Sequence, residues 1–359
     1  MDLNQTKDVV LIGLSVIIPV HNGAEFLDRC LDSLGRSSFG DYECIVVDDA
    51  STDASGAVAL RHGASVVTLA RNGGPAQARN AGAQRAGGEI LLFLDADVCV
   101  HPETLAGVAA HFRVHPAADA VIGSYDDAPA DPGFVSQYKN LFHHYVHQTS
   151  RSDAWTFWGG CGAIRRAVFL AAGGFDESYR RPCVEDIALG FRLRTLGHRI
   201  DLERTIQVTH LKRWTFWSLL RTDVLDRGIP WFRLMLADRS MPADLNVTNT
   251  HRLSVALVCV TVLLAGVVAT RALLVSAGHS SLLLPLLLWT VIAAAMLFFL
   301  NRDLYRFFAR KRGLVFAART VPMHWLYYAY CGVAVVAGLG LHLLDQLIPR
   351  RDRPRVTTS

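Results

Sequence analysis

Three long apolar stretches without charged residues constrain this chain more than any other feature of its sequence. They run from Leu253 to Thr270, from Ser281 to Leu300 and from Thr320 to Leu344, and they hold 18, 20 and 25 residues. A helix needs about 20 residues to cross the hydrocarbon core of a bilayer. The first stretch is expected to continue past Arg271, whose long side chain can snorkel. The sequence therefore predicts about three transmembrane helices within residues 253–348.

The net charge of +4 is unevenly distributed along the chain. Residues from Leu253 onward hold 11 Lys and Arg against 3 Asp and Glu, whereas the preceding part holds 25 against 29. An acidic soluble part argues against nucleic-acid binding. The basic residues flank the apolar stretches, where they orient helices and attract anionic lipid.

The first hundred residues alternate strand and helix patterns, which predicts an α/β fold with a doubly wound, mostly parallel sheet and helices on both faces. Asn22 with Glu25 three residues later reads as a capping box for the first helix. The expected strands are Ser15–Val20, Glu43–Val47, Ser65–Leu69 and Glu89–Leu94, and the expected helices are Glu25–Leu34 and Pro75–Ala86.

The pattern becomes less regular after residue 120. Phe134–Ser150 has helical spacing, Phe157–Gly162 is a glycine-rich loop, and Glu185-Asp186 opens a further helix. Trp214–Leu236 combines aromatic and basic residues, which is typical of interfacial helices. We therefore predict a catalytic α/β domain at 1–210, interfacial helices at 211–252, a membrane region at 253–348 and a basic tail at 349–359.

Two predicted strands end in carboxylates, at the sheet edge where α/β proteins bind ligands. Asp95 and Asp97, one residue apart, can share a hard divalent cation such as Mg²⁺ or Mn²⁺. Asp48 and Asp49 can accept hydrogen bonds from a base or from ribose hydroxyls. A solvated turn and a helix cap are the alternative readings of these two motifs, with Asp53 or Ser51 as the cap.

Two further motifs offer groups for anion binding and proton transfer. Gly73-Gly74 opens a helix, lets the backbone approach phosphates closely, and precedes Arg79, whose charge can reach a diphosphate or a base. Glu185-Asp186 begins another helix, and a carboxylate there can take a proton from an attacking hydroxyl. Capping charge at a helix start is the alternative reading of that pair.

Six motifs in one order resemble the family 2 glycosyltransferases with the GT-A fold, over roughly residues 13–215. The resemblance implies an inverting, metal-dependent transfer of a sugar from a nucleotide-diphosphate donor of UDP or GDP type. The motifs are PVHN at 19–22, VVDDASTD at 46–53, GGPAQARNAG at 73–82, FLDAD at 93–97, GGFDE at 173–177 and EDIALGFRLRTLG at 185–197.

The resemblance also implies roles for individual residues. Asp186 would be the general base, with Glu185 as the alternative, and Asp97 would hold the metal. Asp95 would face the ribose or the metal. The remaining nucleotide contacts would come from Pro19, Glu25, Asp48 or Asp49, and Arg79.

The segment His210-Leu-Lys-Arg213-Trp214 has the spacing of the Q-x-x-R-W motif of membrane-bound polysaccharide synthases, with His in place of Gln. This departure puts processivity in doubt. His210 is either a third metal ligand or a structural histidine before an interfacial helix. Residues expected to contact the acceptor or the membrane interface are Trp158, Gly159, Gly160, Arg213 and Trp214.

The acceptor is open between two chemistries. A polyprenyl phosphate is already an anion and needs no base, whereas a hydroxyl must lose its proton, so the Glu185-Asp186 pair favours a hydroxyl on a lipid or lipid-linked glycan. A processive polysaccharide synthase and a non-catalytic membrane scaffold are further alternatives. The absence of G-x-G-x-x-G after the first strand argues against a dinucleotide oxidoreductase.

The distribution of charge also predicts topology. Asn301–Gly313 holds five Arg and Lys and one Asp, so it and the catalytic domain should be cytoplasmic. With three spans the Arg-rich tail at 350–355 would then lie outside. Either the tail violates the rule or one stretch does not fully span.

Overall fold

The computed structural model describes residues 13–238, 245–274 and 283–347, which form two compact units. The first comprises residues 13–126 and 152–212. The second comprises 127–151 and the described residues from 213 to 347. Residues 127–151 therefore belong with the C-terminal helices, although they lie between two parts of the sheet in the sequence.

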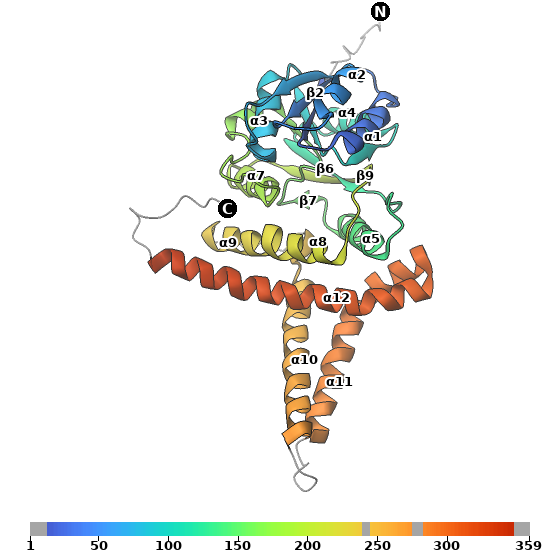
Figure 1. Cartoon of the computed structure of the whole chain (residues 1–359), viewed down its shortest axis with the longest axis vertical. Coiled ribbons are helices and arrows are strands. Elements are labelled where there is room, and N and C mark those ends of the chain that lie inside the picture. The colour runs from blue at the N-terminus through green and yellow to red at the C-terminus, as the bar shows by residue number, and fades with distance from the viewer. Residues whose placement is uncertain (1–12, 239–244, 275–282, 348–359) are drawn as a thin grey trace, which may run out of the picture. The chain divides into compact units, whose positions relative to one another are not determined.

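The first unit is built on one mixed sheet with helices around it (Figure 1). Its strand order is β3-β2-β1-β4-β8-β6-β9-β5, while β7 pairs with β9. The first four strands in this order are parallel, β8 is antiparallel to both β4 and β6, and β5 is antiparallel to β9. The strands are β1 Leu14–Val20, β2 Tyr42–Asp48, β3 Ser65–Thr68, β4 Ile90–Leu94, β5 Val98–Val100, β6 Ala120–Tyr125, β7 Asp153–Ala154, β8 Cys161–Arg165 and β9 Ile200–His210.

Both faces of this sheet are covered, because alternate side chains of each strand point to opposite sides. Val16 and Ile18 of β1 pack into a buried cluster with Leu27 of α1 and Phe112 of α4. On the other face α3 approaches β1 so closely that a Cβ at Gly82 would lie 2.5 Å from Ile17 Cγ2. The predicted doubly wound mixed sheet with helices on both faces is confirmed.

The helices of the first unit follow the predicted spacing, but α1 begins differently than expected. Asn22 and Glu25 do not form a capping box, because the cap position is Gly23 and makes no side-chain cap hydrogen bond. Asp53 from the next loop accepts the Ala24 N–H instead, at 3.0 Å. The helices are α1 Ala24–Gly35, α2 Ser55–Arg61, α3 Pro75–Arg85, α4 Thr104–Val114, α6 Arg166–Ala171 and α7 Glu185–Thr195.

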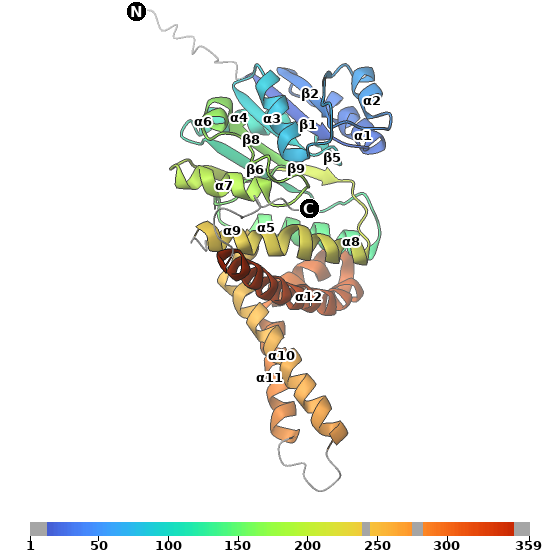
Figure 2. The same cartoon turned by 60° about the vertical axis from the view of Figure 1, so that its left-hand side comes forward.

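The second unit is helical in its described residues. Its helices α10 and α11 pack side by side as an antiparallel hairpin, and α12 crosses one end of that hairpin together with α9 (Figures 1 and 2). A break at Gly313, where φ is +84°, divides α12 into two segments. The elements are α5 Phe134–Thr149, α8 Phe216–Arg221, the π-helix η1 Thr222–Gly228, α9 Ile229–Asp238, the short 3₁₀ helix η2 Leu245–Val247, α10 Asn249–Leu274, α11 Leu283–Leu300 and α12 Arg302–Leu347.

The prediction of three membrane-spanning helices is only partly supported. Among the described residues two helices are long and apolar enough to cross a membrane, Asn249–Leu273 and Arg302–Leu347. The third apolar helix, Leu284–Leu300, is shorter. The predicted stretch Thr320–Leu344 is the C-terminal part of α12 and lies across the hairpin instead of beside it (Figure 2).

Candidate functional site

A buried arginine joins two acidic motifs at the carboxyl edge of the parallel strands. Arg79 of α3 donates from one terminal nitrogen to Asp95 Oδ1, at 2.6 Å, and from the other to Glu185 Oε1, at 3.0 Å. Its side chain is 5% exposed, and that of Glu185 is 6% exposed. The planar guanidinium fork can serve two carboxylates at once. Arg79 therefore holds together motifs that lie 90 residues apart in the sequence.

The surroundings of Arg79 keep it charged and in place. Burial acts to lower the pKa of Arg79, but the charges of Asp95, Glu185 and Asp186 outweigh burial and raise it above its ordinary value. The guanidinium carbon lies 5.4 Å from the centre of the Phe175 ring.

Gly159 passes directly over the same guanidinium. A Cβ at this glycine would lie 3.0 Å from Arg79 Cζ, so any side chain there would displace the arginine. The glycine-rich loop, predicted to contact the acceptor or the membrane interface, is thus also fitted to the charged cluster.

The two carboxylates that open α7 have different environments. Glu185 is occupied on both oxygens, since Oε1 accepts from Arg79 and Oε2 accepts the Cys183 N–H at 2.8 Å. Asp186 is more exposed and accepts the Gly159 N–H on Oδ2 at 3.1 Å. The geometry separates the predicted base from its alternative, with Glu185 held by a cation and Asp186 facing the glycine-rich loop.

The acidic pair after β2 shapes the neighbouring loops. Asp49 accepts the N–H groups of Gly73 and Gly74, each at 2.8 Å, and so anchors the loop that opens α3. Asp48 Oδ1 accepts the Ser51 N–H at 2.9 Å. Both carboxylates are buried. Both residues of the predicted nucleotide-binding pair therefore hold neighbouring loops in place through backbone N–H groups.

Asp97 lies beside His210 in the first unit. The distance from His210 Nε2 to Asp97 Oδ2 is 3.6 Å, and the Asp97 carbonyl accepts the Leu211 N–H at 2.8 Å. Burial acts to raise the pKa of Asp97, but the interaction with His210 and the charge of Lys212 outweigh it and lower the pKa. The short strand β5, antiparallel to β9, brings these two residues together.

Tyr125 stacks on the ring of His210, and Trp158 in turn packs against Tyr125. Tyr125, at the end of β6, stacks on the imidazole with ring centres 4.4 Å apart and planes at 16°. Trp158 of the glycine-rich loop meets Tyr125 edge to face at 4.9 Å. The loop and the imidazole are thereby coupled through one tyrosine.

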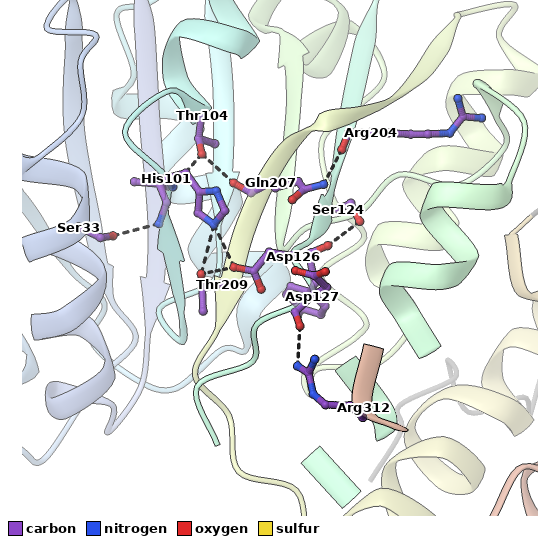
Figure 3. A network of polar contacts seen from close by, with 12 residues as sticks. Ser33, His101, Thr104, Ser124, Asp126, Asp127, Arg204, Gln207, Thr209 and Arg312 are labelled. Carbon is purple, nitrogen blue, oxygen red and sulfur yellow. Dashed lines mark hydrogen bonds and ion pairs between the residues drawn. The ribbon is translucent and has the colours of Figure 1, made fainter. Parts of the chain in front are cut away.

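A polar cluster at the join of β5, β6 and β9 supports this region (Figure 3). Asp126 follows Tyr125, interacts with His101 Nε2 at 3.0 Å and accepts a hydrogen bond from the Thr209 hydroxyl. The hydrogen bond to Asp126 raises the pKa of His101, and burial opposes it. Thr209 precedes His210, so the cluster restrains the strand that carries the imidazole.

The side chains at this edge fit a divalent cation only in part. Asp97 offers the carboxylate oxygens that Mg²⁺ and Mn²⁺ prefer, and His210 offers one imidazole nitrogen beside them. Asp95, the third predicted ligand, is turned toward Arg79. Within the described residues no group of three or more His, Cys, Asp or Glu side chains is arranged to hold a metal ion. Any further ligands would have to come from a donor diphosphate or from water.

The other predicted site residues are scattered. Pro19 lies in β1 opposite Val47, and Glu25 is exposed in the first turn of α1. Arg213 and Trp214 belong to the second unit, where Arg213 Nε lies 3.9 Å from Asp131 Oδ2 and the Trp214 N–H donates to Ser136 at 2.8 Å.

Sequence reasoning missed residues that act through neighbours. Tyr125 and Asp126 end an apolar strand in the stretch where the sequence pattern was least regular, so nothing local marked them. Phe175 lies inside the GGFDE motif, and that motif was the available signal.

The sequence of the first unit is similar to known glycosyltransferases. Residues 15–171 match the model of Glycosyl transferase family 2. The validoxylamine A glucosyltransferase of Streptomyces hygroscopicus subsp. jinggangensis is 30% identical over 225 residues, which cover 53% of this chain and 53% of that protein. An uncharacterized glycosyltransferase of Haemophilus influenzae is 30% identical over 183 residues, covering 46% and 58%. The chain thus spans little more than half the length of these curated relatives.

Solved structures show the same fold. The mannosyltransferase PcManGT from Pyrobaculum calidifontis, in complex with GDP-Man and Mn²⁺, has a TM-score of 0.61 at 19% identity and covers 91% of this chain and 87% of that one. A fragment of S. aureus TarS in complex with UDP-GlcNAc has a TM-score of 0.50 at 19% identity, covering 90% and 92%.

Proposed function

The chain contains a family 2 glycosyltransferase domain, and from this premise we propose that it is an inverting enzyme that moves a sugar from a nucleotide-diphosphate donor to a membrane-associated hydroxyl acceptor. The observation that carries the proposal is the division between Glu185 and Asp186. One carboxylate is neutralised by Arg79, and the other faces the glycine-rich loop at the edge where α/β proteins bind ligands.

The donor would lie over the carboxyl ends of β1, β2 and β4. Asp49 sets the loop Gly73-Gly74, whose glycines allow the close backbone approach that phosphates need. Arg79, enclosed by two carboxylates, would act by positioning Asp95 toward the ribose instead of touching the nucleotide itself. The structural relatives were solved with either a GDP-sugar or a UDP-sugar, so both donor types stay open.

Transfer would proceed in one displacement. Asp186 would take the proton of the acceptor hydroxyl as its oxygen attacks the anomeric carbon. The bond from that carbon to the diphosphate would break on the opposite face, with its electron pair leaving on the diphosphate, so the configuration inverts. The role of Glu185 would be to fix Arg79 and the start of α7.

Asp97 and His210 would hold a divalent cation, Mg²⁺ or Mn²⁺, with the carboxylate as the hard oxygen donor that both ions prefer. When bound, such a cation would neutralise the charge that develops on the diphosphate. Tyr125 would keep the imidazole plane fixed by stacking.

An acceptor at a bilayer is supported by the second unit. Its helix α10 has a mean hydropathy of 2.5 over its most apolar window and exposes side chains such as Val262 and Leu263. A contiguous exposed apolar surface of this kind is typical of contact with lipid. The catalytic domain, proposed at residues 1–210, would then act on the cytoplasmic side, where nucleotide sugars are made available.

The test is release of nucleoside diphosphate by the purified full-length chain, with D186N compared to wild type. A set of UDP- and GDP-sugars is supplied with and without Mn²⁺, together with a lipid extract as acceptor source. We expect D186N to lose about 100-fold or more in turnover, because a positioned base contributes 10²–10⁴-fold.

The control is E103Q, an exposed carboxylate on another part of the same unit, which should keep wild-type activity. Near-wild-type turnover in D186N would contradict the assignment of Asp186 as the general base. It would favour a polyprenyl phosphate acceptor, which needs no base. If no nucleotide sugar is consumed by the wild-type chain, and neither nucleoside diphosphates nor Mn²⁺ change its melting temperature, a non-catalytic scaffold becomes the better reading.

A further inference from the structure

The long helix α12 exposes apolar side chains and makes polar contacts with neighbouring helices. Most of its exposed side chains after the break at Gly313 are apolar, with Val333 60% and Val336 73% exposed, whereas Arg319 and Gln346 are exposed polar ones. Five of the apolar residues recur at the intervals of three, four and seven that place side chains on one helix face. We call these five, Leu326, Val333, Val336, Leu343 and Leu347, the exposed apolar stripe; Val335, Leu339, Leu341 and Leu344 are exposed beside it.

Three polar contacts join α12 to neighbouring helices, one just before the break and two after it. Arg312, at the break, donates to Gln137 of α5 at 2.8 Å. Tyr330 donates to the buried Asp223 of η1 at 2.7 Å, and Asp345 pairs with Arg233 of α9.

The contact of Tyr330 is part of a buried charged group. Asp223 also accepts from Lys139 of α5, at 2.6 Å, and the side chains of these two residues are 6% and 15% exposed. Charged groups within a bilayer are costly. Tyr330 lies within the apolar stretch Thr320–Leu344, so the Lys139–Asp223 pair that it contacts would lie at the depth of the hydrocarbon core if α12 crossed it.

Length and hydropathy point the same way. The segment Leu314–Leu347 is about 50 Å long at 1.5 Å per residue, whereas the hydrocarbon core is about 30 Å thick. The most apolar window of α12 has a mean hydropathy of 1.5, compared with 2.5 for α10. Helix α11, with 18 described residues, packs along α10 and is about 27 Å long. The lengths of α10 and α11 thus match the bilayer better than that of α12, although by length and composition α12 is a candidate span and α11 is the shorter helix.

We propose that α10 and α11 form a two-span hairpin, and that α12 lies flat in the surface of an anionic bilayer with its exposed apolar stripe in the acyl region. This inference rests on the membrane-associated function proposed above. The hairpin and the stripe belong to the same unit, so the lipid surface that α10 enters continues along α12. The exposed Arg302, Arg306 and Arg310 near the start of α12 would then be available to anionic headgroups.

This arrangement removes the conflict in the charge pattern. Three spans would place Asn301–Gly313 and the tail on opposite sides, whereas two spans place both on the cytoplasmic side. The sequence 275–282 between the two spans holds no Lys or Arg, which agrees with a position on the other side.

The first test is the sidedness of a C-terminal epitope tag on the full chain, measured by protease digestion of right-side-out and inverted membrane vesicles. We expect the C-terminal tag and a tag before residue 13 to be cut from the same side, and a tag inserted at 275–282 to be cut from the other. Cleavage of the two terminal tags from opposite sides would show that α12 crosses and would overturn the proposal.

The second test asks whether the stripe touches lipid. Val336 is replaced by p-benzoylphenylalanine and the protein is irradiated in vesicles of phosphatidylcholine and phosphatidylglycerol that carry radiolabelled lipid. Leu60, which is 66% exposed on the first unit, is the matched control. We expect lipid adducts at position 336 at least tenfold above position 60. Equal yields at the two positions would overturn the flat placement, whatever the tags show.

Failure here is distinguishable from failure of the proposed enzyme. Hydrolysis of the nucleotide sugar by the wild-type chain in detergent does not depend on the placement of α12. If the chain turns over the donor but the two terminal tags are cut from opposite sides, only the placement of α12 is wrong. If there is no turnover but both terminal tags are cut from the same side, only the proposed enzyme activity is wrong.

Discussion

Replacing Arg79 by methionine tests whether one buried cation holds the site together. Arg79 neutralises Glu185, whose side chain is 6% exposed, and Asp95, whose side chain is 35% exposed. Removing one partner of a buried ion pair costs about 3–5 kcal/mol, because a buried charge is left uncompensated. At about 2–4 °C per kcal/mol for a domain of this size, R79M should melt about 6–20 °C below wild type.

A double variant separates the buried charge from the lost arginine. In R79M/E185Q the uncompensated carboxylate is gone, so at least about half of the lost stability should return. Activity should remain absent in both variants, since Asp95 has lost its partner. The control is R61M, because Arg61 and Asp28 form an exposed pair with side chains 62% and 47% exposed, and such pairs contribute about 0–1 kcal/mol.

The assay is thermal unfolding of the full chain in detergent, followed by near-ultraviolet circular dichroism, alongside release of nucleoside diphosphate. A melting temperature for R79M within the change seen for R61M would refute the reasoning. So would a double variant that melts no higher than R79M, since the penalty would then come from packing and not from charge.

Three further predictions concern the neighbours of this cluster. G159A should lower turnover at least about tenfold, because its Cβ would lie 3.0 Å from Arg79 Cζ, while G40A, with open space around it, should not; equal activities would contradict the close fit. H210Q should raise the Mn²⁺ concentration for half-maximal activity by about 10-fold or more, measured by metal titration, and an unchanged titration would mean a purely structural histidine. The hydrogen bond to Asp126 raises the pKa of His101, so this pair should stabilise the fold most below about pH 6.5 and lose its contribution as the pH rises through the raised pKa. The difference in melting temperature between wild type and H101Q should therefore shrink from pH 5.5 to 8. A constant difference would contradict the assignment.

The sequence alone was sufficient for the four parallel strands of the sheet and their acidic edge, but not for the strands from β5 to β9. Short apolar runs such as Ile90–Leu94 bury both faces, and strands whose carboxyl ends share one edge bring Asp48 and Asp95 into one region whatever the rest of the chain does. The order of six motifs also sufficed to recognise the family, because each marks a local turn or helix start that the sequence itself specifies. The capping box at Asn22 failed because Asp53, thirty residues on, supplies the contact instead.

Contacts between distant segments were decided only by the tertiary structure. Nothing local tells Glu185 from Asp186, which are neighbours at a helix start; the difference arises because α3 brings Arg79 to one of them and the glycine-rich loop comes to the other. The same holds for Thr320–Leu344. Its composition alone predicts a span, but its Tyr330 donates to the buried Asp223 of η1. Hydropathy records how apolar a helix is, whereas only the packed structure shows which of its faces remains uncovered.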